Sequence, residues 1–303
     1  KSNVAAPRSP SAIAAVTHAH EQTAKAFPGK DILIGETGWP SQGRQREGAV
    51  PGRVNEARFV RGFVAHAAAE GWHYNLIEAF DQPWKRGQEG AVGGYWGLFD
   101  AARNDKHILR GPVSNLPGWR GCLALSLGLC AGLLIAAGGW RAPGAVLLAA
   151  VAANGVVFHL QQMRLFSRSA TETGWFLLLA ALALVLGWIG ARRLRGRPPA
   201  RWHDALIGTA AALAAIEMLG LAFDARYRHF PLAVFAAPAL AAWLFAPHGG
   251  PWRERNRALG LLFVLCMPAV LWQETLLNLQ ALGWLAVSGV MATGLLRGGM
   301  RVV

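Results

Sequence analysis

Residues 31–41 read Asp-Ile-Leu-Ile-Gly-Glu-Thr-Gly-Trp-Pro-Ser, a short apolar run that ends in an acidic side chain. The run follows a turn at Pro28 and Gly29, and this pattern predicts a buried strand that ends at Glu36. The sequence Thr-Gly-Trp-Pro that comes next interrupts the strand. Barrels of alternating strands and helices place catalytic carboxylates at the carboxyl ends of buried strands. A Glu that caps or pairs within a loop fits the spacing equally well.

Helical and extended patterns alternate on both sides of this strand. Residues 11–27 and 54–70 have the periodicity of helices, and residues 74–80 have that of a second strand. A closed barrel needs eight strands, and lone parallel strands leave open edges. Two strands therefore predict that residues 1–303 are the C-terminal part of a longer polypeptide.

Three stretches resemble one known family. Residues 34–41, Ile-Gly-Glu-Thr-Gly-Trp-Pro-Ser, resemble the signature of glycoside hydrolase family 17, the β-1,3-glucanases. Residues 74–85 resemble the last barrel strand of its bacterial, membrane-anchored branch, and residues 94–100 resemble the closing segment. The resemblance implies that residues 1–112 are the C-terminal portion of a (β/α)8 TIM barrel, an α/β fold, with Glu36 as the catalytic nucleophile.

The same resemblance implies a sugar site beside the nucleophile. It places Glu78, Asp81 and Lys85 on that site, although a structural Glu78–Lys85 pair explains two of them equally well. Flat aromatic rings suit the C–H face of a pyranose, but Trp also fills protein cores. The predicted substrate-binding residues are Trp39, Glu78, Asp81, Trp84, Lys85 and Trp96.

The resemblance implies a retaining glycosidase or transglycosylase. Such enzymes use two carboxyl groups about 5–5.5 Å apart, one ionised for attack and one protonated for departure of the leaving group. Water or a sugar hydroxyl then resolves the glycosyl-enzyme, which gives hydrolysis or transfer. Nothing in residues 31–41 decides between these two outcomes.

The second carboxyl group is not predicted within this chain. In the family the general acid sits in an Asn-Glu pair at a strand end, whereas Asn55 and Glu56 lie in a helical run. Glu56 is therefore predicted to be an exposed residue near a helix N-terminus. We expect the acid upstream and the fragment alone to be inactive. Arg44 and Arg46, in the loop after Glu36, are interpreted as solvated charges rather than sugar ligands.

The rest of the chain has the composition of a membrane protein. Hydrophobic residues make up 53% of the sequence and charged residues 16%. After a linker over 113–118, residues 119–303 are predicted to form an all-α polytopic transmembrane bundle of about seven helices. Three cysteines lie inside apolar runs, so neither a disulfide framework, a metal site nor a cofactor is expected. The candidate spans are 119–139, 143–161, 174–190, 204–223, 230–246, 258–273 and 279–296.

Loop charges predict the orientation. With residue 118 outside, eleven Arg fall in inner loops and five in outer loops, which fits the positive-inside rule. The glycosidase part is then periplasmic, on a bacterial inner membrane. The formal net charge of +13 belongs largely to these loops, so we expect no nucleic acid partner. The outer residues are Arg120, Arg164, Arg168, Arg226 and Arg228; the inner residues are Arg141, Arg192, Arg193, Arg195, Arg197, Arg201, Arg253, Arg255, Arg257, Arg297 and Arg301.

Several polar residues fall within the predicted spans, where they are costly and often functional. Glu274 and Asn278 are four residues apart, and a shared helix face at the outer boundary would bind a glucan or a lipid-linked sugar. Hydrogen bonding between helices is the alternative explanation for the whole set. His159 is predicted to be interfacial. The set is Asn154, His159, Glu217, Gln273, Glu274, Asn278 and Gln280.

Three functions remain open at this point. The first is a membrane-bound β-1,3-glucan hydrolase or transglycosylase that acts on glucan outside the cytoplasm. The second is a non-catalytic glucan-binding component of a synthesis or export system, with a glucan synthase as its partner. The third makes the membrane part a plain anchor for the enzyme. The expected partners are β-glucan and the lipid bilayer.

Overall fold

The computed structural model describes residues 9–198, 201–225, 227–247 and 252–297. The chain divides into two compact units, and each is described here by itself. The first unit is Lys1–Pro117 with Leu276–Asn278, and the second is Gly118–Thr275 with Leu279–Val303. Arg226 and Arg301, which enter the loop-charge count above, lie outside the described residues.

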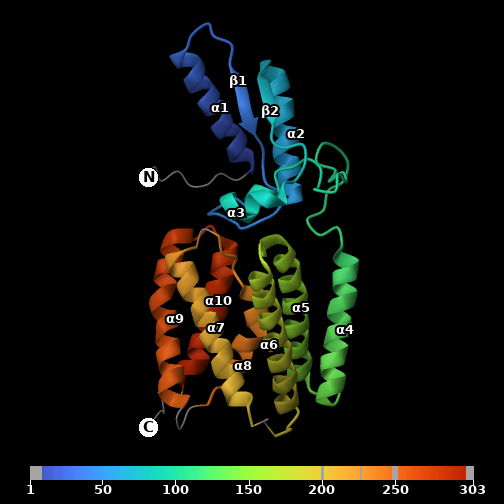
Figure 1. Ribbon diagram of the computed structural model, residues 1–303, viewed down its shortest axis with the longest axis vertical. Helices are drawn as coiled ribbons and strands as arrows, with labels where there is room; N and C mark the ends of the chain where they lie inside the picture. The colour runs from blue at the N-terminus through green and yellow to red at the C-terminus, as the bar shows by residue number, and fades with distance from the viewer. Residues whose placement is uncertain (1–8, 199–200, 226, 248–251, 298–303) are drawn as a thin grey trace. The chain divides into compact units, whose positions relative to one another are not determined.

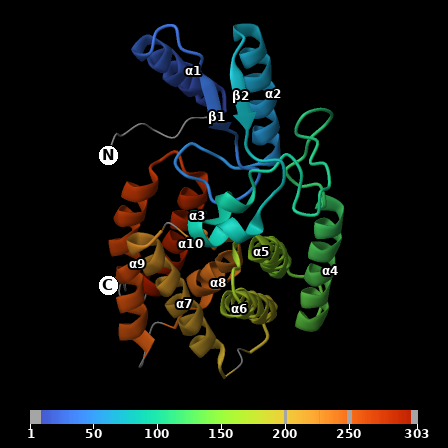
Figure 2. The ribbon, with the colours of Figure 1, turned by 45° about the horizontal axis from the view of Figure 1, so that its top comes forward.

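The first unit is built on a helix–strand–helix–strand order, as the sequence predicts. The two strands run parallel and lie side by side, with Leu33 opposite His73 and Thr37 opposite Leu76 (Figures 1 and 2). The helix α2 forms the crossover between them, which is the usual way to connect parallel strands. The elements are α1 (Ser9–Ala26), β1 (Leu33–Thr37), α2 (Arg53–Glu70) and β2 (His73–Leu76).

The prediction that the first strand is buried is wrong. Leu33 is 60% exposed and Glu36 is also exposed, whereas Thr37 at the end of β1 is buried. The reason is that the sheet has two strands in the described residues, so the apolar run has a packing partner on one side only. The core of this unit lies on α2, where Phe59 and Phe63 are both at most 2% exposed.

The second strand is shorter than predicted, because β2 ends at Leu76. The residues after it pair instead with a segment that returns from further along the chain. The Glu78 amide donates to the Trp96 carbonyl over 2.8 Å, and Phe80 and Phe99 form a parallel bridge. Two 3-10 helices, Pro83–Lys85 and Ala91–Gly94, and the short α3 (Arg86–Glu89) make this return.

Gly97 permits the close approach of these two segments. A Cβ atom at this position would lie 2.1 Å from the Asp81 nitrogen and 2.6 Å from the Phe99 carbonyl oxygen. Those distances are far inside van der Waals contact, so a residue with a side chain does not fit here. The close approach lets the Gly97 amide donate to the Asp81 carboxylate over 2.9 Å.

The second unit consists of apolar helices that run up and down (Figure 1). Each of the seven predicted spans lies on one of them. Among the described residues, six of these helices are long and apolar enough to cross a membrane, and α8, with 14 residues, is shorter. The helices are α4 (Trp119–Ala137), α5 (Pro143–Phe166), α6 (Ala170–Leu194), α7 (His203–Phe223), α8 (Leu232–Phe245), α9 (Trp252–Glu274) and α10 (Leu279–Leu296).

Small residues bring these helices together. A Cβ atom on Gly155 of α5 would lie 2.2 Å from the Ala233 carbonyl oxygen of α8. Gly294 of α10 meets the backbone of α8 at Trp243 in the same way, at 2.5 Å. Helices in membranes lack a hydrophobic force between them and pack through such close backbone contacts. The centre is filled by Trp284, which is fully buried.

The structure shows the surroundings of several of the polar positions in the predicted spans. His159 is 2% exposed and packs between helices, where its Nε2 lies 3.1 Å from the Phe176 carbonyl oxygen; its predicted interfacial depth stays a prediction. Asn154 is exposed and donates within its own helix, to the Ala150 carbonyl. Glu274 and Asn278 do not share a helix face, because α9 ends at Glu274 and α10 begins after Asn278.

The orientation remains a prediction, and reporter fusions test it. A fusion after residue 197 should report the cytoplasm and a fusion after residue 228 the periplasm, because α7 (His203–Phe223) separates the two positions. The reporters are alkaline phosphatase, active only outside, and green fluorescent protein, fluorescent only inside. The opposite activities at both positions would overturn the predicted topology.

Candidate active site

A pocket of about 560 Å³ lies at the carboxyl end of β1. Glu36, near the end of the strand, is exposed and lines it, together with Trp39 and Trp96. Arg44 and Arg46 line it too, so the loop charges face the same space as the carboxylate. Among the described residues that line the pocket, Glu36 is the one carboxylic acid. The site thus joins one acid, two guanidinium groups and two indole rings.

Trp39 lines this pocket and also packs into the core of the first unit. Its ring is 7% exposed and lies against Phe59 of α2, with ring centroids 6.0 Å apart. Its Nε1 donates to the Val50 carbonyl over 3.1 Å, which ties the loop after β1 back to the strand end. Gly38 beside it allows the loop after β1 to approach the backbone at Ile77, since a Cβ atom on Gly38 would lie 2.4 Å from the Ile77 carbonyl oxygen.

Glu78 and Lys85 form the ion pair that the sequence left open as an alternative. The Lys85 Nζ lies 2.8 Å from the Glu78 Oε2, and Gln82 donates to the same oxygen. The hydrogen bond that Lys85 donates to the Glu78 carboxylate raises the pKa of Lys85. Trp84 is 67% exposed beside this pair. Within the described residues, Glu78, Asp81, Trp84 and Lys85 are not part of the lining of the Glu36 pocket.

Asp81 belongs to a buried charged cluster that sequence reasoning missed. Lys106 is 3% exposed, and its Nζ lies 3.0 Å from Asp81 Oδ1 and 3.4 Å from Glu56 Oε2. The same nitrogen donates to the Ser41 hydroxyl over 2.9 Å. We refer to Glu56, Asp81 and Lys106 as the buried triad. The triad connects α2 to the exit of β2, and the hydrogen bond from Lys106 to Ser41 connects it to the loop after Glu36.

The prediction that Glu56 is exposed is wrong, because this side chain is completely buried. Burial raises the pKa of Glu56 to about 8 against the opposing attraction of Lys106. Burial also raises the pKa of Asp81, and Lys106 again opposes the shift. Helical periodicity did not predict the burial of Glu56, because the compensating cation, Lys106, lies 50 residues further along the chain.

The structure offers no arrangement that would hold a metal ion in the described part of the chain. No three His, Cys, Asp or Glu side chains there come together as a set of ligands. The three cysteines are half-buried and free.

Comparison with known proteins connects the first unit to glycosidases. Residues 5–97 match the family model of the BtgE/BtgC glycoside hydrolase domain. The glucan 1,3-beta-glucosidase of Saccharomyces cerevisiae is 32% identical over 90 residues, which cover 29% of this chain and 29% of the yeast protein. The glucan 1,3-beta-glucosidase of Arthroderma benhamiae is 37% identical over 81 residues, 25% of this chain and 26% of that protein.

The matches cover only part of each protein. The chain spans less than a third of the length of the two relatives, so most of each relative has no counterpart in the match. One solved structure, an active-site mutant of Rhizomucor miehei beta-1,3-glucanosyltransferase in complex with laminaritriose, is 23% identical. It covers 34% of this chain and 36% of that chain with a TM-score of 0.30. The sequence similarity to a glycoside hydrolase domain rests on the family model, over residues 5–97.

Proposed function

We propose that this chain belongs to a membrane-bound, retaining β-1,3-glucan hydrolase or transglycosylase of glycoside hydrolase family 17, with Glu36 as its nucleophile. The observation that carries the proposal is the position of Glu36, which lines a pocket at the carboxyl end of a parallel strand in the segment that matches a glycoside hydrolase domain. The relatives named for β-1,3-glucosidase activity support glucan as the substrate class.

The proposed chemistry begins with attack by the Glu36 carboxylate on the anomeric carbon. The bond from that carbon to the leaving oxygen breaks, and a second carboxyl group protonates the oxygen. Water or a sugar hydroxyl then displaces Glu36 with loss of a proton to the same second group. Trp96, which is partly exposed, offers a flat face for a pyranose, and the mostly buried Trp39 forms the wall beside it. Arg44 and Arg46 line the same pocket, so in place of the solvated charges expected from the sequence we assign them as donors to the sugar hydroxyl groups.

The sequence-predicted ligands Glu78, Trp84 and Lys85 form a second, adjacent part of this proposal. Trp84 is exposed, and the Glu78–Lys85 pair presents both a donor and an acceptor. We propose that they hold sugar units beyond the reacting one. Asp81 acts differently: because Lys106 and the Gly97 amide bind its carboxylate, it holds the loop after β2 rather than the sugar.

A mechanism-based label tests the nucleophile. A 2-fluoro glycoside of β-1,3-linked glucose with a good leaving group should trap a covalent adduct on Glu36 in the complete gene product, because the fluorine slows both steps and the leaving group restores only the first. Peptide mass mapping after trapping identifies the residue. Adduct formation on Glu78, or no adduct on any residue while glucan is still turned over, would contradict the assignment.

We propose further that residues 1–303 alone turn over no glucan. The reason is that the pocket of Glu36 offers no second carboxyl group among its described lining residues. Laminarin incubated with the purified chain should release no more sugar than with its Glu36→Ala variant. Release above that background would show that an acid within this chain serves the site. Glucan binding without turnover by the complete gene product would favour the non-catalytic role.

A further inference from the structure

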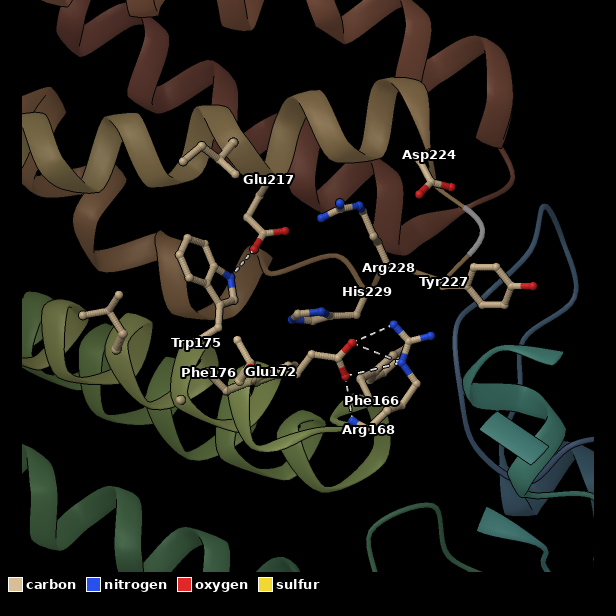
Figure 3. A pocket seen from close by; sticks show the side chains of 14 residues that line it. Phe166, Arg168, Glu172, Trp175, Phe176, Glu217, Asp224, Tyr227, Arg228 and His229 are labelled. Atoms are coloured by element: carbon tan, nitrogen blue, oxygen red, sulfur yellow. Dashed lines mark hydrogen bonds and ion pairs between the residues drawn. The ribbon is translucent and has the colours of Figure 1, made fainter. Parts of the chain in front are cut away.

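A second pocket, of about 570 Å³, lies entirely within the helical unit (Figure 3). Its residues come from the end of α5, the first half of α6, the last part of α7 and the segment that joins α7 to α8. In the predicted orientation these helix ends face the periplasm. The wall gathers carboxylates, guanidinium groups and aromatic rings in one place, which an apolar helix bundle does not need for its packing.

The deepest acid of this pocket is Glu217 on α7, which is 5% exposed. One carboxylate oxygen accepts a hydrogen bond from Trp175 Nε1 of α6 over 2.5 Å. The second oxygen points away from the indole (Figure 3). Polar groups in membrane helices are costly unless they find partners. Trp175 therefore fixes the carboxylate, which retains one oxygen with capacity to accept a further hydrogen bond.

Arg228 supplies a guanidinium cation to the pocket, where its charge acts on the Glu217 carboxylate. Its side chain is exposed and lies against α7, since a Cβ atom on Gly220 would be 2.6 Å from the guanidinium carbon. In the part of the chain that the structure describes, Arg228 forms no ion pair, whereas Arg168 in the same pocket lies 2.7 Å from Glu172. The Arg228 guanidinium thus has donors available to a ligand.

His229 is the second group with unused hydrogen-bonding capacity. Its ring is 9% exposed, lies in the middle of the pocket and stacks on Phe176 with centroids 4.6 Å apart (Figure 3). Its Nε2 is buried and has no hydrogen-bond partner among the described residues. Burial lowers the pKa of His229 to about 3, so the ring is neutral. An unpaired buried nitrogen in a native structure calls for a ligand or water.

The mixture of groups identifies the class of ligand. Glu172, Glu217 and Asp224 bring three carboxylates against the guanidinium groups of Arg168 and Arg228, so neither a phosphate nor a cation meets a matching field. A hydroxyl group is both donor and acceptor, and it pairs with either kind of side chain. The rings around the pocket suit the apolar face of a pyranose.

We propose that this pocket binds a short neutral saccharide at the outer end of the helical unit, between Trp175, Glu217, Arg228 and His229. The site is separate from the one around Glu36, and it gives the membrane part a role in holding carbohydrate. The identity of the saccharide as a β-1,3-linked glucan rests on the proposed function, whereas the ligand class rests on the pocket itself.

Photo-crosslinking tests the site. A photoreactive laminaritriose is irradiated with the complete gene product in detergent micelles, and adducts are mapped by peptide mass. We expect adducts in residues 164–178 or 216–230, reduced about tenfold or more in Arg228→Gln and Trp175→Phe, because each removes a donor that orders the site. Trp188→Phe is the matched control, since Trp188 lies on α6 outside the pocket lining, and it should leave the adducts unchanged.

The outcomes separate this proposal from the function proposed for Glu36. Absence of adducts in both segments, or equal adducts in wild type and Arg228→Gln, overturns the saccharide site even if the fluoroglycoside labels Glu36. Suppression by millimolar inorganic phosphate but not by unlabelled laminaritriose identifies an anion site and also overturns it. Adducts that maltotriose suppresses as well as laminaritriose, without labelling of Glu36, support a saccharide site and contradict the glucan function.

Discussion

Glu36→Gln in the complete gene product should lower kcat on laminarin by several orders of magnitude. The amide keeps the shape of the side chain but loses the negative charge and most of the nucleophilicity, so the proposed glycosyl-enzyme no longer forms. Each factor of ten corresponds to about 1.4 kcal/mol of activation free energy. KM should change little, because an amide still forms hydrogen bonds with sugar hydroxyls. Steady-state release of reducing sugar gives both constants.

Glu70→Gln is the matched control for this substitution. Glu70 is exposed at the end of α2 and lies outside the lining of the Glu36 pocket, so the same chemical change there should leave kcat within about twofold. A Glu36→Gln variant that retained a tenth or more of wild-type kcat would rule out Glu36 as the nucleophile. A parallel rise of KM and loss of binding would instead assign Glu36 to substrate holding.

Local patterns in the sequence predicted the elements well. The periodicity over 54–70 and the apolar runs after Trp119 correspond to α2 and to the helices of the second unit. These features depend on residues three or four apart, or on long stretches of one composition, so a single sequence contains them. The exposure of Leu33 could not be predicted in this way, because it depends on how many strands flank β1.

Contacts between residues far apart in the chain could not be predicted from the sequence. Glu56 has the position of a solvent-exposed acid in the first turn of a helix, and only the approach of Lys106 accounts for its burial. His229 lies in a connecting segment with no motif, yet its ring stacks between helices. The break between α9 and α10 removed the predicted Glu274–Asn278 face, since Thr275 has a φ of 64° and leaves the helix.

The second large effect is expected for Lys106→Met, which keeps the length and apolar stem of the side chain but removes its charge. In the buried triad this leaves Glu56 and Asp81 without the cation that lies 3.4 Å and 3.0 Å from them. Removal of one partner from a buried ionic cluster costs about 3–5 kcal/mol, because the carboxyl groups that remain must either stay charged without water or keep a proton without a hydrogen-bond partner. The first unit should therefore open far more often at pH 7.

Hydrogen exchange measured by mass spectrometry on the complete gene product reports this opening in peptides from 53–70 and 96–108. Lys85→Met is the matched control: the partner of Lys85, Glu78, is partly exposed and water screens the pair, so this variant should lose far less protection than Lys106→Met. Equal exchange in the two variants would mean that the buried triad does not hold the unit together. Adding Glu56→Gln to Lys106→Met should restore part of the protection.

The pH dependence gives the same cluster an independent signature. The folded pKa of Glu56, about 8, lies above its unfolded value near 4.5, so the folded state binds more protons between these two values. The contribution of Glu56 to stability is therefore complete below pH 4.5 and is lost as the pH rises to about 8. Protection of α2, corrected for the intrinsic exchange rate, should fall across this window and fall more steeply in Lys106→Met, where Asp81 also retains its proton. A protection that does not change with pH in Lys106→Met would show that both acids are solvated, and that the triad is not closed in solution.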